Sequence, residues 1–384
     1  MIFQDEPALA WAAADYGQFV SIRPRGVLRP STVAEIRAAA LVGLPLRARG
    51  QGHSTAGQAQ QADAIVVDMR GLNAIHEVTS EQVVVDAGAR WSEVLAATLP
   101  KGRTPPVLTD YLELSVGGTI SAGGIGGATH RHGLVVDNVA SLEVLTPDGE
   151  IHTCGPCHPL FDAVRAGQGS SGIILRASLR LTPAPARACR YLLHYADLAS
   201  FLADQRLLMA SRRFSYLEGQ AKPGRHYEIE AVSHYSPPAQ PDAALLLEGL
   251  SHNFVESVED LSYFEFLNRL ASGEEFLRSV GDWDRPHPWS DVFLPDHAAD
   301  GFLASFMAEL TVDDVGENGV ILIYPFDTGL MTAPRLRVPA TPVAFLLAVL
   351  RTAPDTGPGL ARMLAGRQDL RARALAAEGT IYLD

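Results

Sequence analysis

The sequence predicts an α+β fold in two domains, and three observations support this prediction. The chain has 384 residues, which exceeds the size at which one hydrophobic core usually keeps growing. Its first part reads as helix, strand, strand, strand and helix, an order that differs from strict βαβ alternation. After Pro183-Ala184-Pro185 the glycine clusters stop, and aromatic and histidine residues become more frequent. We therefore expect one domain over 1–183 and a second α+β domain over 184–384.

Short sequence patterns predict the elements of the first domain. A helix is expected after Pro30, because Ser31 or Thr32 can cap it and Glu35 completes a capping box. Another helix is expected over 91–99, where apolar residues recur at helical spacing. Runs of apolar and β-branched residues predict strands, and these cover 44–48, 64–68, 82–88, 140–146 and 172–181.

Composition and charge narrow the class of protein. The net charge is −13, and 47% of the residues are hydrophobic, which is typical of a globular protein. An acidic balance argues against nucleic acid as a partner, because phosphate binding needs a basic face. No apolar run approaches the ~20 residues that span a bilayer, and the N-terminus lacks the pattern of a signal peptide. We expect a cytoplasmic protein with a small-molecule substrate and neither a nucleic-acid nor a membrane partner.

The three cysteines do not predict a metal site. Cys154 and Cys157 flank a Gly-Pro pair, and Cys189 is remote from both. A closed zinc site needs four ligands, and no second pair of cysteines is present. We interpret the segment 154–157 as a structural loop and expect no metal.

The most informative motif is the loop after the strand over 44–48. Its residues are Arg49, Gly50, Gln51, Gly52, His53 and Ser54. Two glycines around Gln51 allow a tight turn whose amide groups can converge on an anion. His53 places an imidazole nucleophile beside this cradle. The loop therefore predicts a phosphorylated cofactor that is attached covalently.

A Rossmann fingerprint is the alternative interpretation, because Gly50 and Gly52 follow a strand and Asp68 lies at about the expected distance. Thr55, however, occupies the third glycine position, and the segment 54–63 is too short for the crossover helix. Further on, a dense group of glycines indicates backbone packed closely against a flat or bulky group. This group comprises Gly117, Gly118, Gly123, Gly124, Gly126, Gly127 and Gly133.

Together these motifs resemble the vanillyl-alcohol oxidase superfamily of FAD-dependent oxidoreductases, and within it most closely the cytokinin dehydrogenases. The resemblance rests on the loop 49–54 with Gln58 and on the segments 109–121, 131–133, 160–177, 287–289 and 322–325. It covers nearly the whole chain. It implies a two-subdomain FAD-binding domain of the PCMH type, followed by a substrate domain with an antiparallel sheet and helices.

The resemblance also implies roles for individual residues. His53 would carry an 8α-histidyl bond to the flavin, and Asp110 would be the catalytic base. Glu274 and Trp289 match positions of the substrate pocket and complete the implied catalytic set. The implied cofactor-binding set is Arg49, Gly50, Gln51, Gly52, His53, Ser54, Gln58, Asp110, Ser115, Ser121, Ile125 and Ile174. No cysteine follows Tyr111 where doubly tethered relatives have one, so a single tether is implied.

The sequence departs from the family pattern in two places. Asp291 stands where cytokinin dehydrogenases have asparagine, which leaves the substrate open. The family usually continues with a segment that contains Asp-Pro and Pro-Gly-Gln motifs and returns to the flavin. This sequence ends at Asp384 before such motifs, so we expect the substrate domain to lack that segment.

We expect an FAD-linked oxidase or dehydrogenase that oxidises a C–N or C–OH bond by hydride transfer to flavin N5, since side chains cannot accept a hydride. Asp110 would take the accompanying proton, and oxygen or a quinone would accept the electrons. The alternatives are an alcohol or sugar-lactone oxidase of the same superfamily and a catalytically degenerate FAD-binding protein. Structural roles stay open for Asp110, as a turn residue, and for Trp289, as a core aromatic. Glu218 is expected in a solvated turn.

Overall fold

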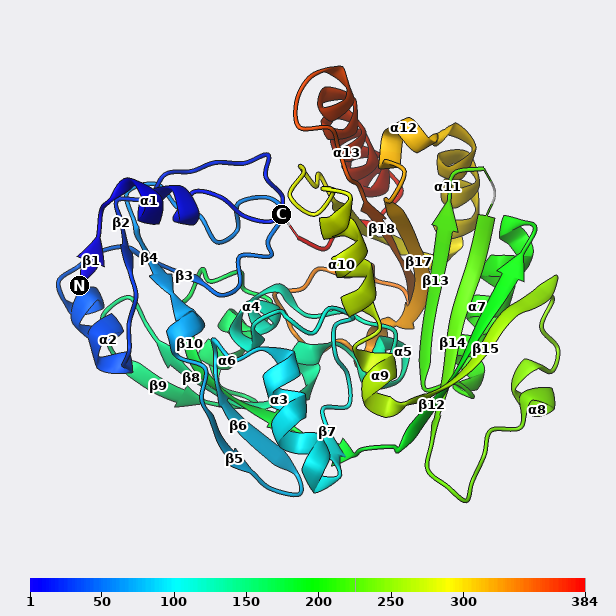
Figure 1. Cartoon of the computed structure of the whole chain (residues 1–384), viewed down its shortest axis with the longest axis horizontal. Helices are drawn as coiled ribbons and strands as arrows, with labels where there is room; N and C mark the ends of the chain where they lie inside the picture. The colour runs from blue at the N-terminus through cyan, green and yellow to red at the C-terminus, as the bar shows by residue number, and fades with distance from the viewer. Residues whose placement is uncertain (225, 384) are drawn as a thin grey trace. The chain divides into compact units, whose positions relative to one another are not determined.

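The computed structural model describes residues 1–224 and 226–383 and separates into two compact units. The first unit contains Met1–Ile125, Leu134–Ala184 and Thr332–Leu336. The second contains Gly126–Gly133, Pro185–Met331 and the residues from Arg337 onward. Helices and sheets occur in both, so the predicted α+β class is confirmed (Figure 1).

The first unit contains a small, mostly parallel sheet on which the glycine loop is built (Figure 1). Its strands, in spatial order, are β1 (Ile2–Phe3), β2 (Gly26–Leu28), β4 (Ile65–Asp68) and β3 (Leu46–Arg49). Strands β2, β4 and β3 run parallel, whereas β1 is antiparallel. Helices α1 (Glu6–Ala12) and α2 (Val33–Leu41) accompany this sheet, and the short helix η1 (Met69–Gly71) follows β4.

A second sheet of the first unit is antiparallel throughout. Its order is β5 (Ile75–Val78), β6 (Gln82–Asp86), β10 (Ile173–Arg180), β8 (Val139–Leu145) and β9 (Ile151–Cys154). Helix α3 (Trp91–Thr98) packs on β5 and β6 (Figure 1). The remaining elements are η2 (Leu99–Lys101), β7 (Arg103–Thr104), α4 (Val116–Ala122), η3 (Val135–Asn138), α6 (Pro159–Val164) and β11 (Thr182–Pro183).

The second unit is built on one eight-stranded antiparallel sheet. In spatial order the strands are β15 (Phe254–Ser262), β12 (Arg187–Tyr195), β14 (His226–Tyr235), β13 (Tyr216–Lys222), β17 (Val320–Asp327), β18 (Val343–Leu350), β16 (Ser290–Pro295) and β19 (Thr380–Ile381). The antiparallel sheet expected for this part of the chain is therefore present.

Three long helices cover the apolar face of this sheet: α7 (Leu198–Ser211), α11 (Asp296–Glu309) and α13 (Pro358–Ala376). Their apolar residues form one core with the side chains of β12, β14 and the neighbouring strands. The other helices of this unit are α5 (Thr129–His132), α8 (Ala243–Leu247), α9 (Tyr263–Leu267), α10 (Leu270–Ser279), α12 (Val312–Val315) and η4 (Thr328–Leu330).

The opposite face of the sheet carries charged residues, several of them buried. Glu230 is 1% exposed and pairs with Arg190 and Arg269. Glu218, on β13, is 3% exposed and lies beside the Tyr216 hydroxyl and the Arg269 guanidinium. The expectation of a solvated turn at Glu218 is therefore wrong. Its carboxyl group is buried because a hydroxyl and a guanidinium replace the water that it loses.

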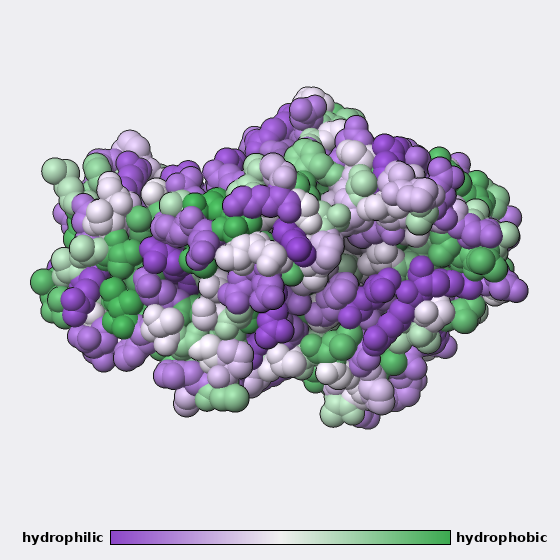
Figure 2. Space-filling model, turned by 90° about the horizontal axis from the view of Figure 1, so that it is seen from below, coloured by the Kyte–Doolittle hydropathy of each residue, from purple (hydrophilic) through white to green (hydrophobic). Residues whose placement is uncertain are grey.

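The predicted local elements agree with the structure to within a few residues. Helix α2 begins after Thr32, and Glu35 forms the expected capping box. The strands expected around residue 46 and over 64–68, 82–88, 140–146 and 172–181 correspond to β3, β4, β6, β8 and β10. Hydrophilic and hydrophobic residues are interspersed over the face that Figure 2 displays. Within the described residues, no helix combines the length and the hydropathy that a membrane span requires.

Candidate flavin-binding and active site

The glycine loop begins where β3 ends and is held by a buried carboxylate. Asp15 is 5% exposed, and its Oδ2 accepts hydrogen bonds from Ser54 Oγ at 3.0 Å and from the Gly57 amide at 2.7 Å. The backbone beside it pairs with the same loop, since the Tyr16 amide donates to Gly52 O and the Gly17 amide to Ser54 O. Burial raises the pKa of Asp15. This carboxyl group therefore fixes the loop that the sequence singled out.

Arg49 places a buried cation directly beneath the loop. The residue is 6% exposed, its Nη1 donates to Ala14 O at 2.5 Å, and its guanidinium lies 4.5 Å from the Trp11 ring centre. Its Nε has no hydrogen-bond partner within the described residues. Burial lowers the pKa of Arg49 to about 10. A buried guanidinium with an unused donor favours an anion nearby.

Two glycines of the loop sit where no side chain fits. At Gly52 the backbone has φ +73°, and an added Cβ would lie 2.2 Å from Arg49 Nη2. At Gly50 an added Cβ would lie 1.9 Å from Ser115 Oγ, at the start of α4. The loop therefore runs against both the buried guanidinium and the beginning of a helix. Close approach of this kind explains why both positions hold glycine.

His53 is held between two tyrosine rings. The Tyr16 ring stacks on the imidazole with a centroid distance of 4.1 Å, and the Tyr111 ring lies at 4.9 Å. Asp110 is the residue before Tyr111, so the loop that carries the predicted base reaches the predicted tether. The structure thus brings His53 together with the segment of Asp110.

The residues of the loop fit a dinucleotide diphosphate. Within the part of the chain that the structure describes, the amides of Gln51, Gly52 and Ser54 donate no hydrogen bond. Backbone amides in such a turn form an anion-binding nest. The buried Arg49 guanidinium adds positive charge at the same place. The loop therefore offers donors that suit an anionic group such as a diphosphate.

The other predicted cofactor residues have different surroundings. Ser115 contacts the loop through Gly50, as described above. The backbone carbonyl of Ser121 accepts from the Gln168 amide, Ile125 is half-buried after α4, and Ile174 is buried in β10. Gln58 accepts from the Ala56 amide through its side chain, and its carbonyl accepts from Arg47. That these residues contact FAD stays a prediction.

Part of the glycine-rich segment packs against protein. An added Cβ at Gly117 would meet Ala87 at 2.7 Å, and one at Gly124 would meet Thr119 at 2.6 Å. In the second unit, a Cβ at Gly127 would lie 2.4 Å from the Tyr216 ring. At these three positions, the close neighbour that the glycine density predicts is another part of the same chain.

The predicted pocket residues Glu274 and Trp289 belong to the second unit. Glu274 lies on α10 and pairs with Arg278 at 2.8 Å. Trp289 precedes β16 and donates through its indole nitrogen to Arg351 O at 3.1 Å. Trp289 is half-buried. It therefore differs both from a fully buried core aromatic and from a fully solvated side chain.

Asp291, two residues after Trp289, is half-buried and has a buried carboxyl oxygen that is unused. Its Oδ1 has no hydrogen-bond partner within the described residues. Burial raises the pKa of Asp291 to about 6, and the charges of Arg367, Arg351 and Arg371 act in the opposite direction. Arg367 itself donates to Trp289 O at 2.9 Å. A polar group with unmet hydrogen-bonding capacity beside Trp289 is what a ligand site requires.

Sequence reasoning missed the residues that support the loop. Trp11, Asp15 and Tyr16 lie more than thirty positions before it, and no spacing in the sequence links them to it. Tyr111 lies in the segment 109–121, but no role beside His53 was predicted for it. Asp15 had one available signal, which is that an acidic residue directly follows three alanines at 12–14.

Comparison with known proteins agrees with this geometry. A family model described as "FAD binding domain" matches residues 24–155, and one described as "Cytokinin dehydrogenase 1, FAD and cytokinin binding" matches residues 222–373. Cytokinin dehydrogenase 10 of Oryza sativa subsp. japonica is 36% identical, over 93% of this chain and 76% of the relative. Cytokinin dehydrogenase 2 of Arabidopsis thaliana is 33% identical, over 84% and 72% respectively.

This chain belongs to the cytokinin dehydrogenase family. As a member of that family it is an FAD-dependent oxidoreductase. It is also 41% identical to an uncharacterized oxidoreductase of the fasciation locus of Rhodococcoides fascians, over 98% of this chain and 88% of the relative. In this member of the cytokinin dehydrogenase family, the matched regions contain both the loop of His53 and the segment of Trp289 and Asp291.

Replacing Gly52 with alanine should reduce the FAD content of the purified protein. The added methyl group would collide with Arg49, which cannot move aside without losing its contacts with Ala14 and Trp11. Gly43→Ala is the matched control, because Gly43 has φ +74° but open space around it. Both variants pay about 1 kcal/mol for the left-handed backbone. The ratio of flavin absorbance to protein should fall only for Gly52→Ala, and equal ratios would contradict the assignment of the nest.

Replacing Asp291 with asparagine should change how stability depends on pH. The pKa of Asp291 is about 6 in the folded chain and ~3.9 in the unfolded chain. The wild type therefore loses stability as the pH rises from about 4 to about 6, because ionisation favours the unfolded state. Urea unfolding at pH 4.5 and 7.5 should show that the variant gains on the order of 2 kcal/mol over the wild type. A constant difference between the two proteins would show that Asp291 is not buried as described.

Proposed function

We propose that this protein oxidises a C–N or C–OH bond of a small molecule and carries FAD on His53. The observation that carries the proposal is the imidazole of His53, held between Tyr16 and Tyr111 beside a loop with available amide donors. A histidine with a purely structural role would need neither the available amide donors of the loop nor the buried Arg49 guanidinium. A tether requires both an oriented nucleophile and a fixed diphosphate.

Each residue of the loop has a separate task in this proposal. The amides of Gln51, Gly52 and Ser54, together with Arg49, bind the pyrophosphate. Tyr16 and Tyr111 restrict the rotation of the imidazole, and His53 would supply the ring nitrogen that bonds the 8α carbon of the flavin. When bound, FAD supplies the hydride acceptor that protein side chains lack. Oxygen or a quinone then takes the electrons.

Asp110 is the proposed general base. A substrate that gives up a hydride from carbon must also lose a proton from the neighbouring nitrogen or oxygen. A carboxylate within hydrogen-bond reach takes that proton. The support for Asp110 is that the next residue, Tyr111, contacts the imidazole of His53. The alternative is that Asp110 is a turn residue, because Thr109 Oγ1 donates a hydrogen bond to Tyr111 O across it.

For the substrate we propose an isoprenoid adenine, bound through Trp289 and Glu274. The support comes from relatives named cytokinin dehydrogenases and from the matched region 222–373. An aromatic ring such as that of Trp289 suits the flat face of an adenine. Asp291 is the specific observation that favours a second candidate. Its unused carboxyl oxygen suits a hydroxyl-rich alcohol or a sugar lactone, which donates more hydrogen bonds.

Anaerobic bleaching of the flavin should distinguish these candidates. Isopentenyladenine mixed with the flavin-loaded protein should abolish the visible flavin band, because electrons have no other acceptor. Polyols and sugar lactones should leave the band intact. Bleaching by polyols or lactones alone would replace the proposed substrate, and bleaching by none of them would support a degenerate FAD-binding protein. An Asp110→Asn variant should bind the adenine and bleach at least about a hundredfold more slowly.

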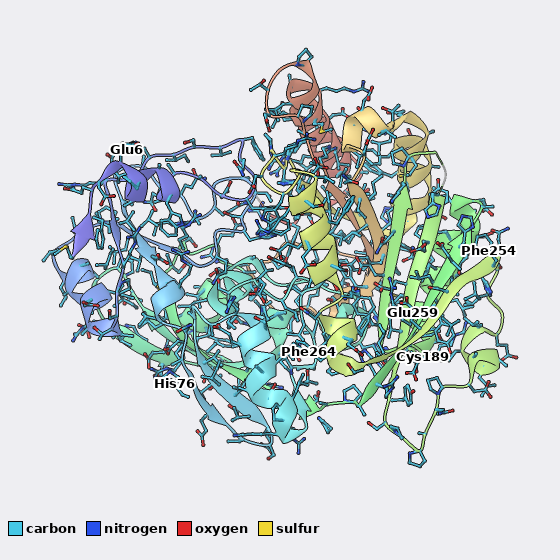
Figure 3. All side chains as sticks on the ribbon, in the orientation of Figure 1. Glu6, His76, Cys189, Phe254, Glu259 and Phe264 are labelled. Carbon is cyan, nitrogen blue, oxygen red and sulfur yellow. The ribbon has the colours of Figure 1, made fainter. Side chains whose placement is uncertain are left out.

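Replacing His53 with alanine should make the flavin extractable. In the wild type, acid precipitation should leave the yellow colour in the pellet, because the flavin is bonded to the chain. In His53→Ala the flavin should appear in the supernatant. His76→Ala is the control, since His76 lies on the edge strand β5 and pairs with Asp86 (Figure 3). Flavin that stays in the His53→Ala pellet would place the tether elsewhere.

A further inference from the structure

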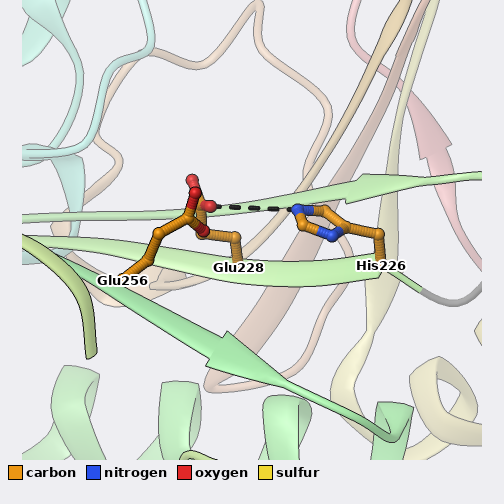
Figure 4. Close-up of side chains that lie close together, drawn as sticks. All are labelled: His226, Glu228 and Glu256. Atoms are coloured by element: carbon orange, nitrogen blue, oxygen red, sulfur yellow. Dashed lines mark ion pairs between the residues drawn. The ribbon is translucent and has the colours of Figure 1, made fainter. Parts of the chain in front are cut away.

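A cluster of three metal-binding side chains lies on the charged face of the eight-stranded sheet (Figure 4). His226 and Glu228 stand two residues apart on β14 and therefore point to the same side of the sheet. Glu256 comes from β15, at the edge of the sheet. All three belong to the second unit and are remote in sequence from the residues assigned to FAD or substrate.

The ligand atoms of these side chains already converge. One atom from each residue lies within 4.8 Å of the others, and His226 Nε2 is 3.8 Å from Glu228 Oε2. The carboxyl groups of Glu228 and Glu256 each contribute an oxygen to this cluster, and these two oxygens lie within 4.8 Å of each other. Two carboxyl groups at this distance repel when both are ionised. A cation between them would remove that repulsion.

A β-bulge places Glu256 in this cluster. In the pairing of β12 with β15, Leu192 is opposite Ser257, whereas Leu193 is opposite Val255. Glu256 is the additional residue between these pairs. Val255 packs against the apolar core on one face of the sheet, and the Glu256 carboxyl reaches Glu228 on the other. Bulges redirect side chains in this way and are common beside binding sites.

His194 supplies a fourth potential ligand. It lies on β12, between the two strands of the cluster, and is the direct partner of Glu228 across the β12–β14 pair. Its ring centre is 5.1 Å from that of His226, and its Nδ1 is buried without a hydrogen-bond partner within the described residues. The Phe254 ring stacks on it at 4.5 Å (Figure 3 shows Phe254 and Glu259 on β15).

We propose that His226, Glu228 and Glu256 bind a zinc ion, with His194 beside them. Zinc accepts imidazole nitrogen and carboxylate oxygen at about 2.0–2.2 Å in a tetrahedral arrangement, which places neighbouring ligand atoms about 3.3 Å apart. Magnesium and calcium favour sites made entirely of oxygen, so a site with histidine discriminates against them.

The proposed ion would join the edge strand β15 to β14 across β12. An edge strand lacks a neighbour on one side and opens more readily than an internal strand. A metal that binds ligands from both strands in the folded chain stabilises the fold by linkage. The site is therefore assigned a structural role at the sheet edge. This inference does not depend on the proposed flavin chemistry.

Equilibrium dialysis of zinc against the flavin-loaded, metal-stripped and untagged protein tests this site. The wild type should bind one zinc ion per chain in a saturable manner. His226→Gln, Glu228→Gln and Glu256→Gln should each weaken binding by at least about tenfold. Excess magnesium should not displace the zinc. An absence of saturable binding, or displacement by magnesium, would overturn the proposal.

Two matched controls exclude other ligands. His76→Gln removes a histidine that also pairs with a carboxylate, at 2.6 Å, but belongs to no three-residue cluster among the described residues. Cys157→Ser removes an exposed thiol that could capture zinc by itself. Both variants should bind zinc as the wild type does. Loss of binding in Cys157→Ser with retention in Glu256→Gln would assign the ion to the thiol and overturn the proposal.

Hydrogen exchange gives a readout that does not depend on affinity. Zinc should slow exchange of the β15 amides in the wild type and leave them unchanged in Glu256→Gln. Retained flavin content in that variant would show that it is folded. Zinc binding without added protection of β15 would overturn the structural role.

Discussion

The buried carboxyl group of Asp15 is the interaction on which the cofactor loop depends. It binds Ser54 and Gly57 at the same time, while the adjoining backbone pairs with Gly52 and Ser54. A buried carboxyl group is stable only when its oxygens are occupied, so the loop and the segment 14–17 fix each other. The amides of Gln51, Gly52 and Ser54, which donate no hydrogen bond among the described residues, are then held where they can bind an anion.

The same principle governs the charged face of the eight-stranded sheet. Glu218 and Glu230 are buried because Tyr216, Arg190 and Arg269 satisfy them. Asp291 differs, since one of its oxygens has no partner among the described residues. Groups that are satisfied internally support the fold. The unused oxygen of Asp291 is one place where a ligand would add the missing interaction.

Sequence patterns predicted features that are local in the chain. The capping box of α2, the strands β4, β6 and β10, and the glycine loop all depend on residues within a few positions of one another. The supports of His53 could not be predicted, because Tyr16 and Tyr111 approach it from distant segments. Glu218 was placed in a turn because its neighbours in sequence suit a turn, and only the pairing of β13 shows otherwise. The zinc cluster was not predicted either, because a bulge between two strands creates it.

The central claim is that the imidazole of His53 is bonded to the flavin that the loop holds. Mass spectrometry of tryptic peptides from the flavin-loaded wild type tests it most directly, because cleavage after Arg49 releases His53 in a single peptide. The account predicts that this peptide carries the mass of FAD and fluoresces as a flavin after the nucleotide is cleaved. An unmodified peptide from protein that is visibly yellow would contradict the account.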